Sequence, residues 1–243
     1  MKFSNKIKEL FKSVKDGYFN EKWVCNACKE ENFNGDYFCK RCKEKLPKIK
    51  EDFCHHCGRK TAFPTLYCDS CIEKNIKFDT ARSIYEYAEP IDKLLLKFKY
   101  EGDKYIANIF IDDLANIFYQ NFADTDVITF VPMHEERIKT REYNQSQIIA
   151  DKLSKEIKIE VVNALVKSKE TARQATLTAT ERRENLSGSF KANKKLIKDK
   201  VVLLIDDVLT TGTTADVCAE RLLKSGAKKV YVLTVASVSY LKK

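Results

Sequence analysis

The spacing of apolar residues predicts alternating strands and helices over the carboxyl-terminal two thirds of the chain. Short continuous apolar runs are typical of strands buried in a parallel sheet. Four such runs occur, at 127–131, about 161–166, 201–205 and 230–236. Apolar residues that recur every three or four positions predict helices at about 90–101, 104–121, 144–156 and 214–225. This alternation predicts an α/β domain with a parallel sheet over residues 79–243.

The amino-terminal segment, residues 1–20, has a different pattern. It predicts an amphipathic helix with lysines on one face and apolar residues on the other, namely Phe3, Ile7, Leu10, Phe11 and Val14. Such a helix can contact a membrane or a partner. We favour packing on its own domain, which is the commoner use of this pattern.

Composition narrows the class of protein. The chain has 243 residues, 44% of them hydrophobic, and a formal net charge of +9. No apolar run is long enough to span a bilayer, and the start Met-Lys-Phe-Ser lacks the apolar core of a signal peptide. We therefore expect a cytoplasmic protein with no integral membrane segment. Its positive charge is compatible with nucleic acid without requiring it.

Eight of the nine cysteines form a repeat that predicts tandem zinc ribbons over residues 21–78. Each ribbon has two C-x2-C pairs separated by ten residues, and the eight cysteines are Cys25, Cys28, Cys39, Cys42, Cys54, Cys57, Cys68 and Cys71. Four thiolates complete the tetrahedral shell of Zn²⁺, so both sites are predicted to be structural. Disulfides are the alternative, but paired C-x2-C units in a cytoplasmic chain favour zinc.

Two histidines of the second ribbon and the ninth cysteine have simpler interpretations. His55 and His56 lie within the second C-x2-C pair and are expected to be solvated, because four cysteines already complete that site. Cys218 is expected to be a small buried apolar residue.

The first ribbon contains an additional pattern, Trp23 before its first cysteine and Asn32 after its second. This spacing is similar to that of Ran-binding-protein zinc fingers, some of which bind single-stranded RNA or ubiquitin. Two roles for Trp23 are open: a mini-core residue of a small ribbon, or a platform for a nucleobase. We favour the mini-core.

The strongest functional signal lies at residues 201–214. An apolar run ends in Asp206 and Asp207, and a hydroxyl-rich loop and a helix follow. Backbone N–H groups at a helix start bind phosphate, and a glycine at 212 lets the ligand come close to the backbone. Carboxylates accept hydrogen bonds from hydroxyls. The combination predicts a phosphorylated sugar as the ligand.

Three alternatives explain less of this stretch. A P-loop requires Gly-Lys-Ser/Thr, which is absent, and a receiver domain has its paired aspartates near its start without such a loop. A capped helix start accounts for the threonines alone. The stretch resembles the phosphoribosyl pyrophosphate (PRPP) motif of type I phosphoribosyltransferases. That resemblance implies that Asp206 and Asp207 bind the ribose hydroxyls, and that the 5′-phosphate is bound by Thr210, Thr211, Gly212, Thr213 and Thr214.

Residues 52–238 as a whole resemble the ComF family of competence proteins. The resemblance rests on the second ribbon, the stretch Lys99-Tyr100-Glu101-Gly102-Asp103, the stretch from Arg141 to Ser146, the pattern Gln174…Asn185…Phe190, and the PRPP-type motif. It implies a type I phosphoribosyltransferase-like domain preceded by a cysteine ribbon. Glu142 departs from the family, which usually has glycine there, and the first ribbon is an extra module.

The resemblance also implies roles for residues outside the PRPP motif. The diphosphate would be bound by a loop at 132–137, with Arg137 and Arg141 as its cations. Arg173, Gln174, Arg182, Arg183 and Asn185 would form a lid. Mg²⁺ would bridge diphosphate and ribose oxygens, and Asp207 would act as a base or charge stabiliser in any transfer reaction.

Three functions remain open at this point. The first is an accessory protein of natural transformation that binds PRPP and single-stranded DNA, and that works with a competence helicase or recombination mediators. The second is an active, Mg²⁺-dependent phosphoribosyltransferase of nucleotide metabolism. The third is a zinc-ribbon adaptor with a vestigial PRPP site. We favour the first, on the family resemblance.

Overall fold

The computed structural model describes residues 22–167 and 188–240, in two compact units divided between Leu46 and Pro47. This division places the second ribbon in the larger unit, whereas the sequence suggested a boundary at 78/79. The expected amphipathic helix at 1–20 lies outside the described residues, as do the lid residues Arg173, Gln174, Arg182, Arg183 and Asn185. Among the described helices, each is too short or too polar to cross a bilayer.

The smaller unit is a ribbon built around its cysteines. Val24 and Glu31 pair across an antiparallel bridge, and Cys39 begins the short helix α2 (Lys40–Glu44). The buried aromatic is Phe38, 3% exposed, whereas Trp23 is 49% exposed. The expected mini-core role of Trp23 is therefore wrong, because Phe38 fills the small interior.

Asn32 has a structural role in this ribbon. Its side chain is buried, and its amide nitrogen donates to the carbonyls of Lys22 and Asp36 at 3.1 and 2.6 Å. These bonds hold the turn that connects the two C-x2-C pairs.

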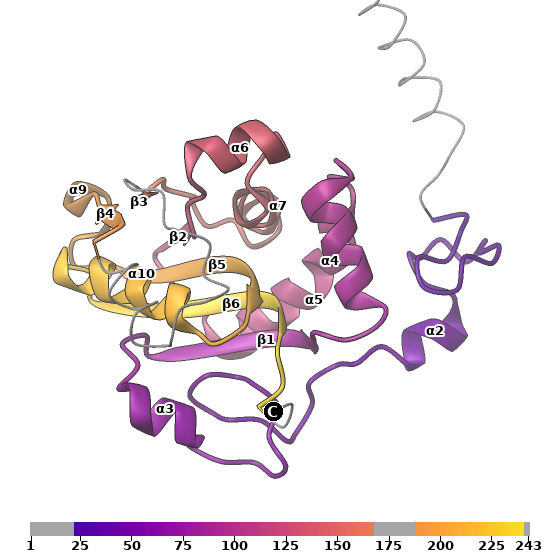
Figure 1. The fold of residues 1–243 in the computed structure, drawn as a ribbon, viewed down its shortest axis with the longest axis horizontal. Coiled ribbons are helices and arrows are strands. Elements are labelled where there is room, and N and C mark those ends of the chain that lie inside the picture. Colours follow the sequence, from indigo (N-terminus) through magenta and orange to yellow (C-terminus); the bar gives the residue numbers. More distant parts are fainter. Residues whose placement is uncertain (1–21, 168–187, 241–243) are drawn as a thin grey trace, which may run out of the picture. The chain divides into compact units, whose positions relative to one another are not determined.

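The larger unit contains the expected parallel sheet (Figure 1). Its four strands lie in the order β1 (Thr80–Glu86), β6 (Lys229–Ser237), β5 (Val201–Leu209) and β2 (Val127–Phe130). All three pairings are parallel. The apolar runs at 127, 201 and 230 are confirmed as strands, and β1 is an additional edge strand that the sequence analysis did not predict.

The four helices predicted after residue 89 are confirmed, and helices cover both faces of the sheet (Figure 1). One face is covered by α5 (Ile106–Asn121) and α7 (Gln145–Ile157), and α4 (Ile91–Tyr100) packs beside α5. The other face is covered by α10 (Thr213–Lys224). Helices therefore cover both faces of the sheet. This is expected for strands made of continuous apolar runs, because such strands have apolar side chains on both faces.

Two predicted segments differ from the structure. In the expected strand at 161–166, only Val161 pairs with the sheet, through Ile128. The chain then enters a separate antiparallel pair, β3 (Leu165–Lys167) with β4 (Phe190–Ala192), and the short helix α9 (Lys194–Ile197) follows. Val166 is 56% exposed, so this run is not buried on both faces and does not form a central strand.

The second difference is at the expected diphosphate loop. Residues 132–134 are irregular as predicted, but Glu135–Arg141 form the helix α6. Its start is capped by His134, whose Nδ1 accepts from the Glu136 N–H at 3.4 Å. The apolar residue Ile138 is 37% exposed. The helix therefore has no buried apolar stripe, and the sequence pattern did not predict it.

The second ribbon packs directly on the amino end of β1. The Ala81 N–H donates to the His56 carbonyl at 2.7 Å, and a Cβ at Gly58 would lie 2.5 Å from the Ala81 carbonyl oxygen. Gly58 also has a φ of +69°, so both backbone conformation and space require glycine there. The ribbon ends in helix α3 (Asp69–Lys74), which leads into β1.

Candidate functional site

The two acidic residues lie at the carboxyl edge of the sheet, on the part of β5 that extends just beyond the end of the neighbouring strand β2. Asp206 and Asp207 are still within β5, which continues to Leu209. The Val131 N–H donates to the Ile205 carbonyl at 3.0 Å, so the segment after β2 runs next to the acidic pair. Ligands of open α/β sheets bind outside this edge.

A pocket of about 380 Å³ opens at this edge. Its polar lining combines both carboxylates with four basic residues, Lys99, Arg137, Arg141 and Lys167. The remaining lining residues are Val131, Pro132, Met133, His134, Asn144, Gln145, Ser146, Phe190 and Thr214. With four basic and two acidic residues, the pocket favours a polyanion that also carries hydroxyl groups.

Asp206 is held by two hydrogen bonds to one oxygen. The Ser146 hydroxyl and the Asp207 N–H both donate to Asp206 Oδ1, each at 2.9 Å. Burial raises the pKa of Asp206 to about 7, and the neighbouring Asp207 charge adds to this. Near neutral pH the carboxyl group therefore changes between a form that only accepts hydrogen bonds and one that also donates.

Asp207 is paired with a lysine from a distant part of the chain. Its Oδ2 lies 2.7 Å from Nζ of Lys99, on α4. Burial by itself lowers the pKa of Lys99, but the Asp207 charge more than offsets this, so the pKa is raised. The ammonium thus stays charged and neutralises Asp207 in the ligand-free site.

The segment Thr210–Thr214, here called the phosphate loop, connects β5 to α10. Gly212 begins the helix with a φ of +77°, which glycine adopts without strain. The hydroxyl oxygens of Thr211 and Thr213 lie 2.9 Å apart, within hydrogen-bond distance. The first N–H groups of an α-helix have no partner within the helix, and this end of its dipole is positive, so the loop can hold a phosphate.

The end of α6 and the residues that connect it to α7 form one side of the pocket. The Arg141 guanidinium donates to the Tyr100 hydroxyl at 2.9 Å and lies over its ring. Asn144 caps α7 by accepting from the Ser146 N–H, and its amide donates to the Val131 carbonyl at 3.0 Å. Glu142, between them, has a φ of +64° and is exposed.

The structure thus brings most of the expected site residues together. Asp206, Asp207, Thr214, Arg137 and Arg141 line the pocket, and Thr210 to Thr213 lie beside it in the phosphate loop. Lys99, Ser146 and Lys167 also line the pocket, and the sequence by itself gave them no role there. Lys99 and Ser146 belong to stretches that supported the family resemblance, and that was the available signal.

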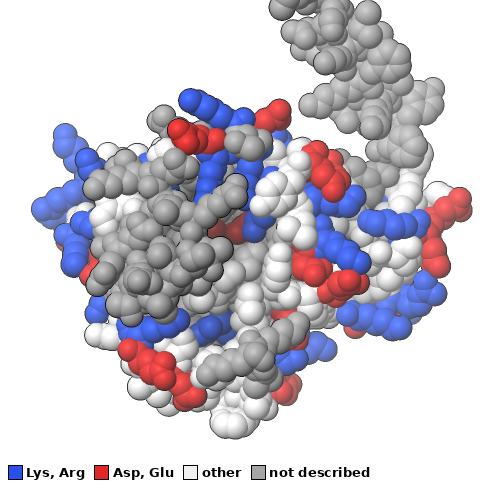
Figure 2. All heavy atoms as spheres, viewed as in Figure 1, with Lys and Arg blue, Asp and Glu red and all other residues white. Residues whose placement is uncertain are grey.

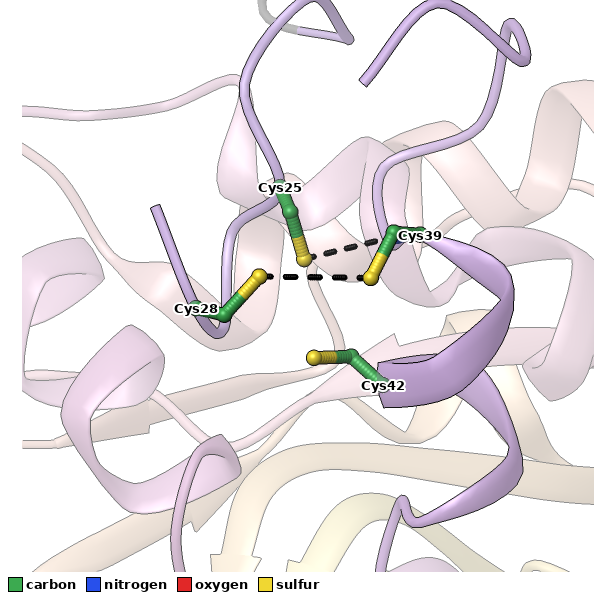
Figure 3. Close-up of side chains that lie close together, drawn as sticks. All are labelled: Cys25, Cys28, Cys39 and Cys42. Carbon is green, nitrogen blue, oxygen red and sulfur yellow. Dashed lines mark hydrogen bonds between the residues drawn. The ribbon is translucent and has the colours of Figure 1, made fainter. Parts of the chain in front are cut away.

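The cysteines form two clusters, and Figure 3 shows the sulfur atoms of the first pointing toward one another. Within each cluster the four Sγ atoms lie within 4.8 Å of one another. The Cys28–Cys39 sulfur distance is 3.9 Å. Four thiolates at about 2.3 Å from a tetrahedral zinc lie about 3.8 Å apart. The geometry therefore fits zinc, with Cys25, Cys28, Cys39 and Cys42 as its ligands.

The second cluster is more enclosed than the first. Its four cysteines are buried, and the Cys54–Cys71 and Cys57–Cys68 sulfur distances are both 3.8 Å. The buried guanidinium of Arg59 donates to the sulfurs of Cys57 and Cys68 at 3.4 and 3.7 Å. It offsets the negative charge of four thiolates around one divalent ion.

The ninth cysteine and the two histidines of the second ribbon differ in burial. Cys218 is buried, as expected. His55 is exposed, whereas His56 is partly buried and stacks on Phe78 with its Nε2 3.0 Å from the Phe78 carbonyl oxygen. The expectation of a solvated side chain is therefore wrong for His56.

Sequence comparisons agree with this architecture. Residues 144–241 match the family model for the phosphoribosyl transferase domain, and residues 20–72 match that for the double zinc ribbon domain. Competence protein F of Haemophilus influenzae is 30% identical over 196 residues, which cover 76% of this chain and 84% of that protein.

Two further relatives have similar coverage. The DNA utilization protein YhgH of Escherichia coli O157:H7 is 26% identical over 86% of this chain and 94% of its own length. Competence protein ComFC of Bacillus subtilis is 28% identical over 75% of this chain and 76% of its own length.

Proposed function

Since this chain belongs to the competence protein F family, we propose that it binds Mg²⁺-PRPP in the pocket at the edge of its sheet and assists the uptake of single-stranded DNA in natural transformation. The observation that carries the first part is the acidic pair, which lines one pocket together with four basic side chains and is followed in the chain by the phosphate loop. The second part is supported by the relatives, which are named for competence and for DNA utilization.

The chemistry of PRPP matches the pocket group by group. The ligand has a 5′-phosphate, two ring hydroxyls and a diphosphate. The phosphate loop would hold the first, Asp206 and Asp207 would accept hydrogen bonds from the hydroxyls, and the guanidinium groups of Arg137 and Arg141 would hold the diphosphate.

Mg²⁺ fits the same region because it prefers hard oxygen ligands. On the protein side, the carboxylates of Asp206 and Asp207 supply such atoms. When bound, the ion would neutralise part of the diphosphate charge.

Lys99 modifies the expected role of Asp207. The ammonium of Lys99 lies 2.7 Å from the Asp207 carboxylate, so this carboxylate is already engaged in an ion pair. In a transfer reaction, positive charge develops on the ribose ring, and a held carboxylate near the ring would stabilise it. We therefore propose that Asp207 stabilises charge, and that Lys99 turns toward the diphosphate when the ligand binds.

For single-stranded DNA, the first ribbon offers a candidate surface. Trp23 and Phe33 are 49% and 74% exposed. The Asn32 N–H donates to the Trp23 carbonyl at 2.7 Å, and this bond links Trp23 to the residue that precedes Phe33. Exposed aromatic rings stack on nucleobases with little sequence preference. Basic and acidic side chains are interspersed on the face of the larger unit that Figure 2 shows, so charge there does not single out one DNA site.

Binding of Mg²⁺-PRPP is tested by calorimetry on the full chain. We expect binding to the wild type and its loss in Asp206→Asn/Asp207→Asn. The control is Asp112→Asn/Asp199→Asn, which removes two exposed carboxylates and should leave the affinity unchanged. A well-folded, zinc-loaded wild type that does not bind Mg²⁺-PRPP contradicts the proposal.

The DNA part has a separate test. Anisotropy of a labelled single-stranded oligonucleotide should report binding that weakens as salt is added, since phosphate contacts release counterions. Absence of binding at low salt would remove the DNA role. A competence helicase or a recombination mediator is then the remaining class of partner.

A further inference from the structure

Helix α3 of the second ribbon reaches the phosphate loop. Its last residue, Lys74, donates from Nζ to the carbonyl oxygen of Thr211 at 3.3 Å. The two residues are 137 positions apart in the chain. This contact joins a cysteine ribbon to the loop in which we place the 5′-phosphate.

The contact sets the direction of a neighbouring N–H group. In a planar trans peptide, the carbonyl of one residue and the N–H of the next point in opposite directions. With the Thr211 carbonyl held by Lys74, the N–H of Gly212 points away from Lys74. Within residues 22–167 and 188–240, no acceptor is bonded to this N–H, so it is available to a phosphate oxygen.

A second bond holds the start of α10 from the same side. The backbone N–H of Lys77 donates to Asp216 Oδ1 at 2.6 Å, and Asp216 is only 2% exposed. Lys74 is the last residue of α3, and Lys77 follows three residues later in the connection to β1. The phosphate loop and the first turn of α10 are thus both attached to the end of α3 and the residues that follow it.

The other end of α3 belongs to the four-cysteine cluster. Cys68 begins the helix and Cys71 lies within it, and the Cys68 N–H donates to the Cys54 sulfur at 3.2 Å. A helix of six residues is not stable by itself in water. Its position therefore depends on the sulfur cluster, and zinc is the ion that fits this cluster.

We propose that the second ribbon contributes to ligand binding at the phosphosugar site. Lys74 positions the phosphate loop, and metal binding at Cys54, Cys57, Cys68 and Cys71 strengthens ligand binding by holding helix α3 and Lys74 in place. This rests on the proposed binding of PRPP. Coupling between two binding sites is reciprocal, so the ligand must also strengthen retention of the metal.

The first test needs no ligand. Backbone ¹⁵N order parameters of Thr211 to Thr214 are measured in the zinc-loaded wild type, Lys74→Ala, Lys74→Arg and Lys60→Ala. Lys60 is the control, because it lies on the same ribbon but pairs with Glu86 at 2.7 Å. We expect the values to fall from about 0.85 to below about 0.6 in Lys74→Ala alone. Equal values in all four proteins would overturn the proposal.

The second test measures affinity by calorimetry with Mg²⁺-PRPP. Lys74→Ala should weaken binding about tenfold, within the usual range of coupling between sites. Lys74→Arg should restore most of the affinity, and Lys60→Ala should leave it unchanged. Unchanged affinity in Lys74→Ala contradicts the positioning role. If the wild type fails to bind, the proposed function is wrong, and the order parameters still decide whether Lys74 holds the loop.

The third test uses the reciprocal effect. Zinc is removed with a chelator, and the freed thiols of the Cys68–Cys71 peptide are alkylated and followed by mass spectrometry. Mg²⁺-PRPP should slow their exposure about fivefold in the wild type and not in Lys74→Ala. Equal rates with and without ligand in the wild type would show that the two sites are independent.

Discussion

The ammonium of Lys99 and the carboxylate of Asp207 form an ion pair of 2.7 Å, with side chains only 19% and 13% exposed. The pair joins α4 to the end of β5, and it places a positive charge where an anionic ligand is expected. It also explains how two adjacent carboxylates coexist in one pocket: Asp207 is neutralised by Lys99, and the raised pKa of Asp206 lets that group take up a proton.

Removal of Lys99 should therefore destabilise the ligand-free protein. In Lys99→Met the Asp207 carboxylate is left without its partner, which we expect to lower the free energy of unfolding by about 2 kcal/mol. Lys99→Met/Asp207→Asn should recover most of this loss. Urea unfolding of Lys99→Met, Asp207→Asn and the double variant gives the interaction free energy between the two side chains. Strictly additive effects would argue against a direct interaction.

The raised pKa of Asp206 predicts how stability depends on pH. The folded protein keeps a proton on Asp206 up to about pH 7, whereas the unfolded chain loses it near its usual value of about 4. The contribution of Asp206 to the free energy of unfolding therefore has its full value below about pH 4, and it is lost as the pH rises to about 7.

Asp206→Asn should therefore raise the free energy of unfolding by roughly 1–3 kcal/mol at pH 8 and change it little at pH 4. Unfolding curves at both pH values check this. In the wild type, Mg²⁺-PRPP affinity should increase between pH 6 and 8, as the carboxylate form becomes populated. An affinity that decreases over this range would contradict the assigned role of Asp206.

Glu142 is the residue that departs from the family's usual glycine, and its backbone explains that preference. At a φ of +64° a residue with a Cβ is strained, so Glu142→Gly should stabilise the protein by about 0.5–1 kcal/mol. Lys158→Gly is the matched control, since Lys158 ends α7 with a φ of +60°. A gain in melting temperature at 158 but not at 142 would mean that the Glu142 side chain contributes a compensating contact.

The two cysteine clusters should differ in how readily they lose metal. The zinc-loaded chain should contain two zinc ions, which elemental analysis can count. With a limiting amount of chelator, the first cluster should lose its ion first, because three of its cysteines are partly exposed. The second cluster is buried and bonded to Arg59. Alkylation followed by mass spectrometry identifies which thiols are freed, and earlier labelling of Cys57 or Cys68 would reverse the expected order.

The exposed aromatics of the first ribbon should matter for DNA and not for the sugar ligand. Trp23→Ala/Phe33→Ala should weaken binding of a single-stranded oligonucleotide by about 1–3 kcal/mol for each base that stacks. Mg²⁺-PRPP affinity and zinc content should stay at their wild-type values. The control Tyr119→Ala removes an aromatic that is 58% exposed on α5, and an equal effect of this control would indicate non-specific binding.

The sequence by itself determined those features whose cause lies within a few residues. The apolar runs at 127, 201 and 230 predicted buried parallel strands, and the C-x2-C spacing predicted both sulfur clusters. The stretch from Asp206 to Thr214 predicted a carboxylate pair followed by a loop at the start of a helix, and the structure has this arrangement. Each of these predictions depends only on the spacing of residues that are close together in the sequence.

Only the tertiary structure decided which distant residues meet at the site. Lys99 on α4 pairs with Asp207 on β5, although the two residues are far apart in the sequence, and Lys74 reaches Thr211 because the second ribbon packs on β1. Helix α6 is exposed and has no hydrophobic period, so the sequence pattern did not predict it. Residues 161–166 do form an apolar run, but tertiary packing pairs Leu165–Lys167 with β4 instead of adding a strand to the central sheet. Long-range contacts depend on how all the elements pack together. The pattern of a single sequence predicts the individual elements but not which of them come into contact.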